Sequence, residues 1–204
     1  KAGYEELEIA YSSQDELKVI QKAFDQEYVG FEIVEQRKNR IVAKNISHIE
    51  HAEFDTILRR IFLFLLQMAE DTLEEIRNSN FEDLGMIVLR DRNINKFTNF
   101  CRRALNKKAA VKYKRIAPLY FIVEQLEKIG DSYRDLAKDL SDDKIRLNKK
   151  MADMLGSLNE FLRLYYGLFY KFDLKKMAEF GKKRKLIRAE FEQLFKSTEK
   201  KNMK

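Results

Sequence analysis

The spacing of hydrophobic residues changes near residue 50. Before it, apolar and polar residues alternate over 4–11, 31–35 and 40–46, and apolar residues recur every three or four positions over 15–24. Alternation is typical of a half-buried strand, whereas a period of three to four residues is typical of an amphipathic helix. The turn-like Arg37-Lys38-Asn39 joins the last two strands. We predict a small β-α-β-β module over 1–48, which needs another element to pack on.

Beyond residue 50 the hydrophobic period is helical throughout. We expect long helices over about 51–78, 81–107, 112–140, 144–171 and 173–198. Their apolar stripes are buried only if the helices pack antiparallel against one another. The apolar positions of 81–107 recur ninety residues later in 173–198. The sequence therefore predicts a mostly α fold of long antiparallel helices in three-helix bundles: a first bundle over 49–140 and a second, incomplete one of two helices over 141–204.

Two of these helices carry matching rows of polar residues at spacings i, i+4 and i+8. The rows are Asp91, Asn95 and Asn99 on one helix, and Glu127, Asp131 and Asp135 on the other. Side chains four residues apart lie one above the other, so stacked acids repel unless a cation or a basic partner lies among them. On a helical wheel both rows lie on the solvent-facing flank of the apolar stripe. Antiparallel packing of these flanks would form one carboxylate-rich patch.

Two interpretations of the patch stay open. Carboxylate and amide oxygens suit Mg²⁺, Mn²⁺ or Ca²⁺, and iron or zinc could also bind although no His or Cys lies in the rows. Alternatively the rows are a solvated flank that pairs with Lys96, Arg134 and Lys138. Gly130 costs about 1 kcal/mol relative to Ala in a helix interior. It indicates close approach of a backbone or a ligand, or tight helix packing.

Composition narrows the function further. The net charge of +7 arises from 40 basic and 33 acidic residues, and a basic run occupies 182–185. It permits nucleic acid, phosphate, anionic lipid or an acidic protein as partner, while a solvated face explains the run equally well. The single cysteine, Cys101, indicates a reducing compartment and a small core residue. No apolar run is long enough for a transmembrane helix, so we expect a cytoplasmic protein without membrane insertion. Because the chain begins at Lys1 rather than Met, we expect residues upstream.

The polar rows also resemble a known family. The segments "RDRNINKFTNFCRRALNK" and "LYFIVEQLEKIGDSYRDLAK" resemble the two signature helices of PhoU-domain proteins. Each signature helix carries an acidic Glu/Asp-x-x-x-Asp motif, the second often as E-x-I-G-D. Glu127, Ile129, Gly130 and Asp131 match the second motif. In the first, Asp91 matches but Asn95 replaces the usual Asp.

The similarity covers 50–204. The β-α-β-β segment followed by "FDTILRRIFLFLLQMAED" resembles archaeal phosphate uptake regulators. In those proteins an AbrB-like DNA-binding domain comes first, and this chain does not include one.

The resemblance implies tandem three-helix bundles and a non-enzymatic cytoplasmic regulator of phosphate uptake. It further implies a metal ion (Fe, Zn, Mn or Mg) on the bundle surface, held by Asp91, Asn95, Glu127, Asp131 and Asp135. The neutral amide of Asn95 leaves the number of metal ions open. The implied partners are a second copy in a homodimer, a phosphate transporter or a signalling protein, and DNA only through the missing N-terminal domain.

The residues leave two other functions open. Aromatic and aliphatic residues of the helix over 144–171, namely Leu162, Tyr165 and Phe169, favour a ligand-free dimerisation scaffold of a transcriptional regulator. A metal-dependent hydrolase has only the acidic residues in its favour. The sequence holds no nucleophile–base arrangement, P-loop or dinucleotide fingerprint, so we expect no catalysis.

Overall fold

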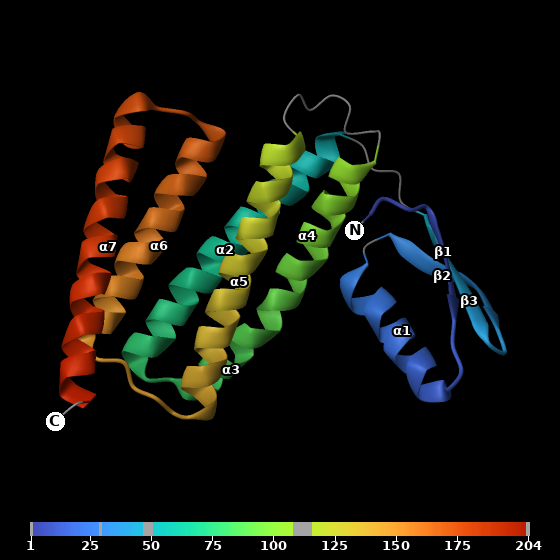
Figure 1. The fold of residues 1–204 in the computed structure, drawn as a ribbon, viewed down its shortest axis with the longest axis horizontal. Helices are drawn as coiled ribbons and strands as arrows, with labels where there is room; N and C mark the ends of the chain where they lie inside the picture. Colours follow the sequence, from blue (N-terminus) through green and yellow to red (C-terminus); the bar gives the residue numbers. More distant parts are fainter. Residues whose placement is uncertain (1, 29, 47–50, 108–115, 203–204) are drawn as a thin grey trace. The chain divides into compact units, whose positions relative to one another are not determined.

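The computed structural model describes residues 2–28, 30–46, 51–107 and 116–202 (Figure 1). Within these residues the chain is mostly helical and contains one three-stranded antiparallel sheet. The mostly α prediction is confirmed at this level. No helix in the described ranges is long and apolar enough to cross a membrane.

The N-terminal module has the predicted β-α-β-β order. Its elements are β1 (Glu6–Ala10), α1 (Gln14–Glu27), β2 (Phe31–Arg37) and β3 (Arg40–Asn45). The strands lie in the order β1-β3-β2, with Ile9 opposite Ile41 and Ile33 opposite Ala43. These side chains belong to the cluster that the sheet buries, together with Phe24 of α1. The apolar half of the alternating pattern therefore forms the core between sheet and helix.

Local sequence sets the start of α1. The Ser13 hydroxyl accepts a hydrogen bond from the backbone N–H of Glu16 (3.2 Å). The Glu16 carboxylate in turn accepts from the backbone N–H of Ser12 (2.7 Å). The first bond satisfies a donor that the first helical turn leaves without a partner, and the second fixes the residue before the N-cap. A serine followed three residues later by a glutamate is the sequence signature of this helix start.

Helix α2 (His51–Asn78) has the predicted bounds, and a tight turn joins it to α3 (Phe81–Ile87). Ser79 adopts a left-handed φ of 55°. Its N–H donates to the Ile76 carbonyl, and the Asn80 N–H donates to the Glu75 carbonyl. This is the Schellman arrangement that ends helices. Asn80 then caps α3 by accepting from the Asp83 N–H.

The single helix predicted over 81–107 is interrupted, and the prediction is wrong in this respect. A 3₁₀ turn (Val88–Arg90) separates α3 from α4 (Asp91–Asn106). A 3₁₀ turn has three residues per turn instead of 3.6, so it changes the direction that the following side chains face. From Thr98 to Leu105 every residue of α4 is buried, polar ones included. The helical spacing of apolar residues predicts burial of one side of a helix only, so it does not predict burial of all these residues.

The last three helices run close to their predicted ranges. They are α5 (Ile116–Asp142), α6 (Lys149–Tyr170) and α7 (Leu174–Asn202). The predicted start of α5, at 112, lies outside the described residues. Helix α6 begins five residues later than predicted because Asn148 caps it, accepting from the Met151 N–H (3.0 Å). Figure 1 shows α6 and α7 side by side as an antiparallel pair. Their Phe161 and Phe180 rings stack at 4.2 Å.

The chain divides into two compact units. One contains Lys1–Leu65 and Leu89–Ser132, and the other contains Leu66–Val88 and Tyr133–Lys204. The predicted boundaries, 1–48, 49–140 and 141–204, divide the chain differently because α2 and α5 each contribute to both units. In the second unit Asn159 of α6 donates to the Ala69 carbonyl of α2 (2.6 Å) and accepts from the Tyr133 hydroxyl of α5 (2.5 Å). Helix α6 therefore packs on more than its neighbour α7.

Candidate functional site at the α4–α5 motif

The α4 row begins with a buried carboxylate. Asp91, the first residue of α4, is 4% exposed, and Asn95 donates from Nδ2 to its Oδ2 (2.7 Å). On the helical wheel Asp91 is the member of its row nearest the core edge, and the structure buries it. A carboxylate at the first turn of a helix is favoured by the positive end of the helix dipole. The Asp91–Asn95 bond fixes the first two members of the row in one arrangement.

Asn99, the third member of the row, has a structural role. It is 6% exposed and donates from Nδ2 to the Glu27 carbonyl (3.3 Å). One turn earlier, Lys96 donates from Nζ to the Asp25 carbonyl (3.2 Å). Both acceptors belong to the last turn of α1, where carbonyls have no partner within the helix and the helix dipole is negative. The N-terminal module thus covers this part of α4, which accounts for the burial of Asn99.

Arg102 is the cation that the acidic row on α5 contacts. Its side chain is 1% exposed and forms ion pairs with Glu124 and Glu127. Its Nη1 donates to Glu127 Oε1 (3.1 Å) and to Asn99 Oδ1 (3.0 Å). Burial lowers the pKa of Arg102, but the bond to Glu127 and the nearby carboxylates raise it, and the net shift is upward. Glu127 is therefore held by a guanidinium.

The next residue, Arg103, contacts the N-terminal module. Its guanidinium lies over the Phe31 ring at 4.9 Å and near the Phe100 ring at 5.9 Å. Burial lowers the pKa of Arg103, and nearby Glu5 opposes this shift. The sequence analysis did not identify either arginine. Their positions directly after Cys101, which lies in the apolar stripe, could have indicated that they are buried.

At Gly130, side chains of α4 come close to the α5 backbone. A Cβ atom at Gly130 would lie 3.2 Å from Ile94 Cδ1 and Cγ2, and 3.4 Å from Asp91 Oδ1. The glycine therefore admits the Asp91 carboxylate and the Ile94 side chain to the α5 backbone. This is the close approach expected from a glycine inside a helix. Two halves of the sequence motif, Asp91 and Gly130, meet here.

The remaining acids of the α5 row are more open. Asp131 is partly exposed, and Asp135 is exposed and pairs with Arg134 Nη2 at 2.9 Å. This last pair is the kind of surface interaction that the second interpretation of the rows predicted. Its contribution to stability is about 0–1 kcal/mol.

Two of the five predicted ligands, Glu127 and Asp135, form ion pairs with Arg102 and Arg134. The other three are Asp91, Asn95 and Asp131, and the Asp91 carboxylate lies against Gly130. No three His, Cys, Asp or Glu side chains in the described ranges are grouped as a metal site. Two carboxylates and one amide fit Mg²⁺ or Mn²⁺, which keep several water ligands, better than Ca²⁺.

Comparison with known proteins gives no matching family model, no matching curated protein and no matching solved structure. The resemblance to PhoU-domain proteins therefore depends on the two quoted motifs and stays a prediction. Cys101, expected in the core, is buried, and its burial raises the pKa of its thiol. It is thus a structural residue.

Proposed function

We propose that this chain is a non-enzymatic, cytoplasmic regulator of phosphate uptake of the PhoU type. In this proposal the helical part is the sensory and protein-binding part. It carries a metal site beside the α4–α5 motif and acts through a phosphate transporter or a signalling protein. DNA binding would belong to a separate N-terminal domain.

The observation that carries the proposal is the meeting of the two motif halves at Gly130. The E-x-I-G-D segment on α5 and the Asp91-x-x-x-Asn95 segment on α4 are far apart in sequence. Asp91 Oδ1 nevertheless lies 3.4 Å from where a Gly130 Cβ would be. A glycine that admits a carboxylate from a second helix gives a physical reason for that residue in the motif. Asp131 follows Gly130 directly in sequence and is the second acid of the α5 motif.

The residues suggest a simple mechanism. Asp91, Asn95 and Asp131 would hold the cation, which would supply positive charge between α4 and α5. The Arg102–Glu127 pair holds the same two helices together from within. Occupancy of the site would then bias the packing of α4 against α5, and with it the affinity for a protein partner.

Isothermal titration calorimetry with Mn²⁺ and with inorganic phosphate tests the sensory role. We expect wild type to bind Mn²⁺, and Asp91→Asn/Asp131→Asn to bind at least about tenfold more weakly. Asp139→Asn, on the same helix two turns from Asp131, is the matched control and should bind like wild type. Absence of heat with either ligand would contradict the sensory site and favour the ligand-free scaffold.

A further inference from the structure

Helix α7 exposes a stripe of large apolar side chains. Met177, Phe191 and Phe195 are 42%, 56% and 57% exposed. Met177, Arg184 and Phe191 follow one another at seven-residue spacing, and Phe195 lies one turn further, so they share one side of the helix. The stripe runs for about 27 Å at 1.5 Å per residue. That is the length of a helix of roughly 18 residues.

Basic residues border this stripe. Helix α7 contains ten Lys or Arg residues and four Glu residues, a net charge of +6. Arg184 lies within the stripe and Arg188 beside it; Arg188 pairs with Glu192 of its own helix (3.1 Å). Most of the net charge of the whole chain, +7, is therefore on this one exposed helix.

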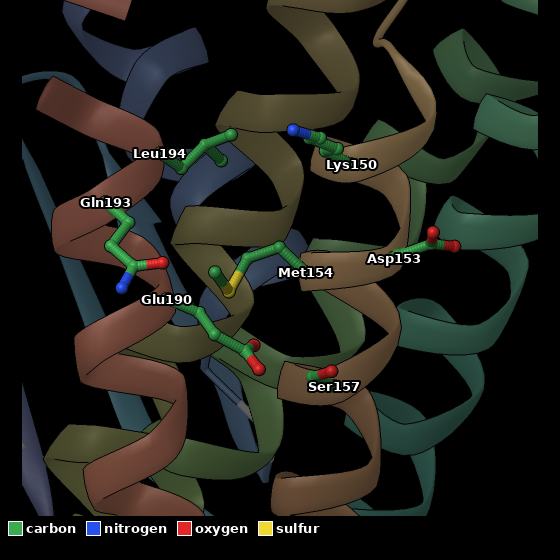
Figure 2. Close-up of a pocket in the computed structure, with 7 residues that line it drawn as sticks. All are labelled: Lys150, Asp153, Met154, Ser157, Glu190, Gln193 and Leu194. Carbon is green, nitrogen blue, oxygen red and sulfur yellow. The ribbon is translucent and has the colours of Figure 1, made fainter. Parts of the chain in front are cut away.

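Next to the stripe, α6 and α7 leave a pocket of about 610 Å³. Figure 2 shows Met154 of α6 and Glu190 of α7 extending toward each other across it, whereas Asp153 points away from α7. Three α7 residues line the pocket, Glu190, Gln193 and Leu194. The exposed Phe191 directly follows Glu190, and the exposed Phe195 directly follows Leu194. The pocket thus lies beside the two exposed rings, where it offers space between α6 and α7 for side chains of another molecule.

Charge decides which molecule fits this surface. A second copy paired through α7 would bring two helices of net charge +6 together, which is unfavourable. A lipid surface favours a helix whose apolar residues share one face, whereas Leu186, 62% exposed, lies about 140° around α7 from Phe191. A helix with an apolar stripe and acidic flanks would satisfy both the exposed rings and the arginines.

We infer that the α7 stripe, Met177, Arg184, Arg188, Phe191 and Phe195, is a docking surface for an acidic amphipathic helix of a partner protein. The inference rests on one part of the proposed function, namely that the chain acts by binding other proteins. It names the partner's chemistry: large apolar anchors at helical spacing for the phenylalanines and the pocket, and Glu or Asp on the flank for the arginines.

A fluorescent, helical 20-residue peptide with leucines at i, i+3, i+4 and i+7 and glutamates beside them is the probe, measured by anisotropy with the full chain. We expect binding that weakens as salt rises. Phe191→Ser/Phe195→Ser and, separately, Arg184→Glu/Arg188→Glu should each weaken binding at least about tenfold. Lys175→Glu/Lys182→Glu, the same charge change away from the stripe, should leave it unchanged. Circular dichroism checks that each variant folds.

Three results would overturn the inference. The first is a peptide affinity that the stripe variants do not change, or equal binding of a peptide with lysines in place of the glutamates. The second is binding to phosphatidylglycerol vesicles without binding to the peptide. The third is a wild-type dimer in sedimentation equilibrium that Phe191→Ser/Phe195→Ser converts to a monomer. Because these variants leave Asp91 and Asp131 intact, unchanged Mn²⁺ binding in them separates this surface from the proposed sensory site.

Discussion

At the scale of the residue, the absence of a side chain at Gly130 sets how closely α4 and α5 approach. Ile94 and Asp91 occupy the space that a Cβ would need. Glycine costs about 1 kcal/mol relative to alanine in a helix interior. Replacing Gly130 with alanine would recover this cost. The tight contact opposes the recovery, because inserting extra atoms into a packed core costs about 1–3 kcal/mol. Sequence alone indicated close approach, and the structure identifies what approaches.

Substitutions at two glycines separate these effects. Gly130→Leu should lower the free energy of unfolding by about 2 kcal/mol, because the side chain must displace Ile94 and Asp91. Gly167→Ala on α6, where nothing lies within 4 Å of the added Cβ, should raise it by about 0.5–1 kcal/mol. Urea unfolding followed by circular dichroism measures both. Equal stability of Gly130→Leu and wild type would contradict the tight α4–α5 contact.

Arg102 shows where prediction from sequence stopped. The spacing of the acidic residues predicted that a cation or a basic side chain would lie among them. Which cation could not be predicted, because Glu127 and Arg102 are 25 residues apart and meet only when α4 packs on α5. Asp135 of the same row pairs instead with Arg134, its neighbour in sequence, which the pattern had already offered as a surface partner. Leu162, expected to face a second copy, is instead buried within the chain.

At the scale of the element, local signals predicted most of the fold. Alternation identified the three strands, and the helical period and scarce glycine identified α2 and α5–α7. The turn at Ser79 and the break at Val88–Arg90 were not predicted. A serine with positive φ carries no sequence signal, and the hydrophobic period of 81–107 continues through the 3₁₀ turn without marking it.

Ionised carboxylates accept hydrogen bonds within the N-terminal module, so the stability of the module depends on pH. Hydrogen bonds from Ser12 lower the pKa of Glu16, and the bond from Arg40 lowers the pKa of Glu35, both from 4.5. A lowered folded-state pKa contributes stability above the unfolded value, and this is lost as pH falls through the folded value. We therefore expect the module to lose stability below about pH 4.5.

Amide hydrogen exchange at Ile41, buried in the sheet, reports on this loss. Glu16→Gln keeps an acceptor for the helix start but cannot titrate, so its exchange protection should depend less on acid pH than that of wild type. Glu32→Gln, on an exposed residue of the same module, serves as the control. Protection that stays constant down to pH values well below 4.5 would contradict the role of these carboxylates.

At the scale of the molecule, α4 is the element that the sequence described least well. Its polar row was expected at a solvated flank, yet Asn99 and Lys96 bind the end of α1 and Arg103 lies over Phe31. Contacts with a module seventy residues earlier cannot be inferred from the period of one helix. Of this row, the proposed cation site uses Asp91 and Asn95, together with Asp131 of α5.

The initial rate of phosphate uptake, in cells of the source organism that lack the gene, tests most directly whether this motif regulates phosphate uptake. We expect the deletion to change the rate, and wild type or Asp139→Asn to restore it. Asp91→Asn/Asp131→Asn, present at the same level, should fail to restore it. Uptake that the deletion leaves unchanged, or full restoration by the Asp91→Asn/Asp131→Asn chain, would contradict the proposal.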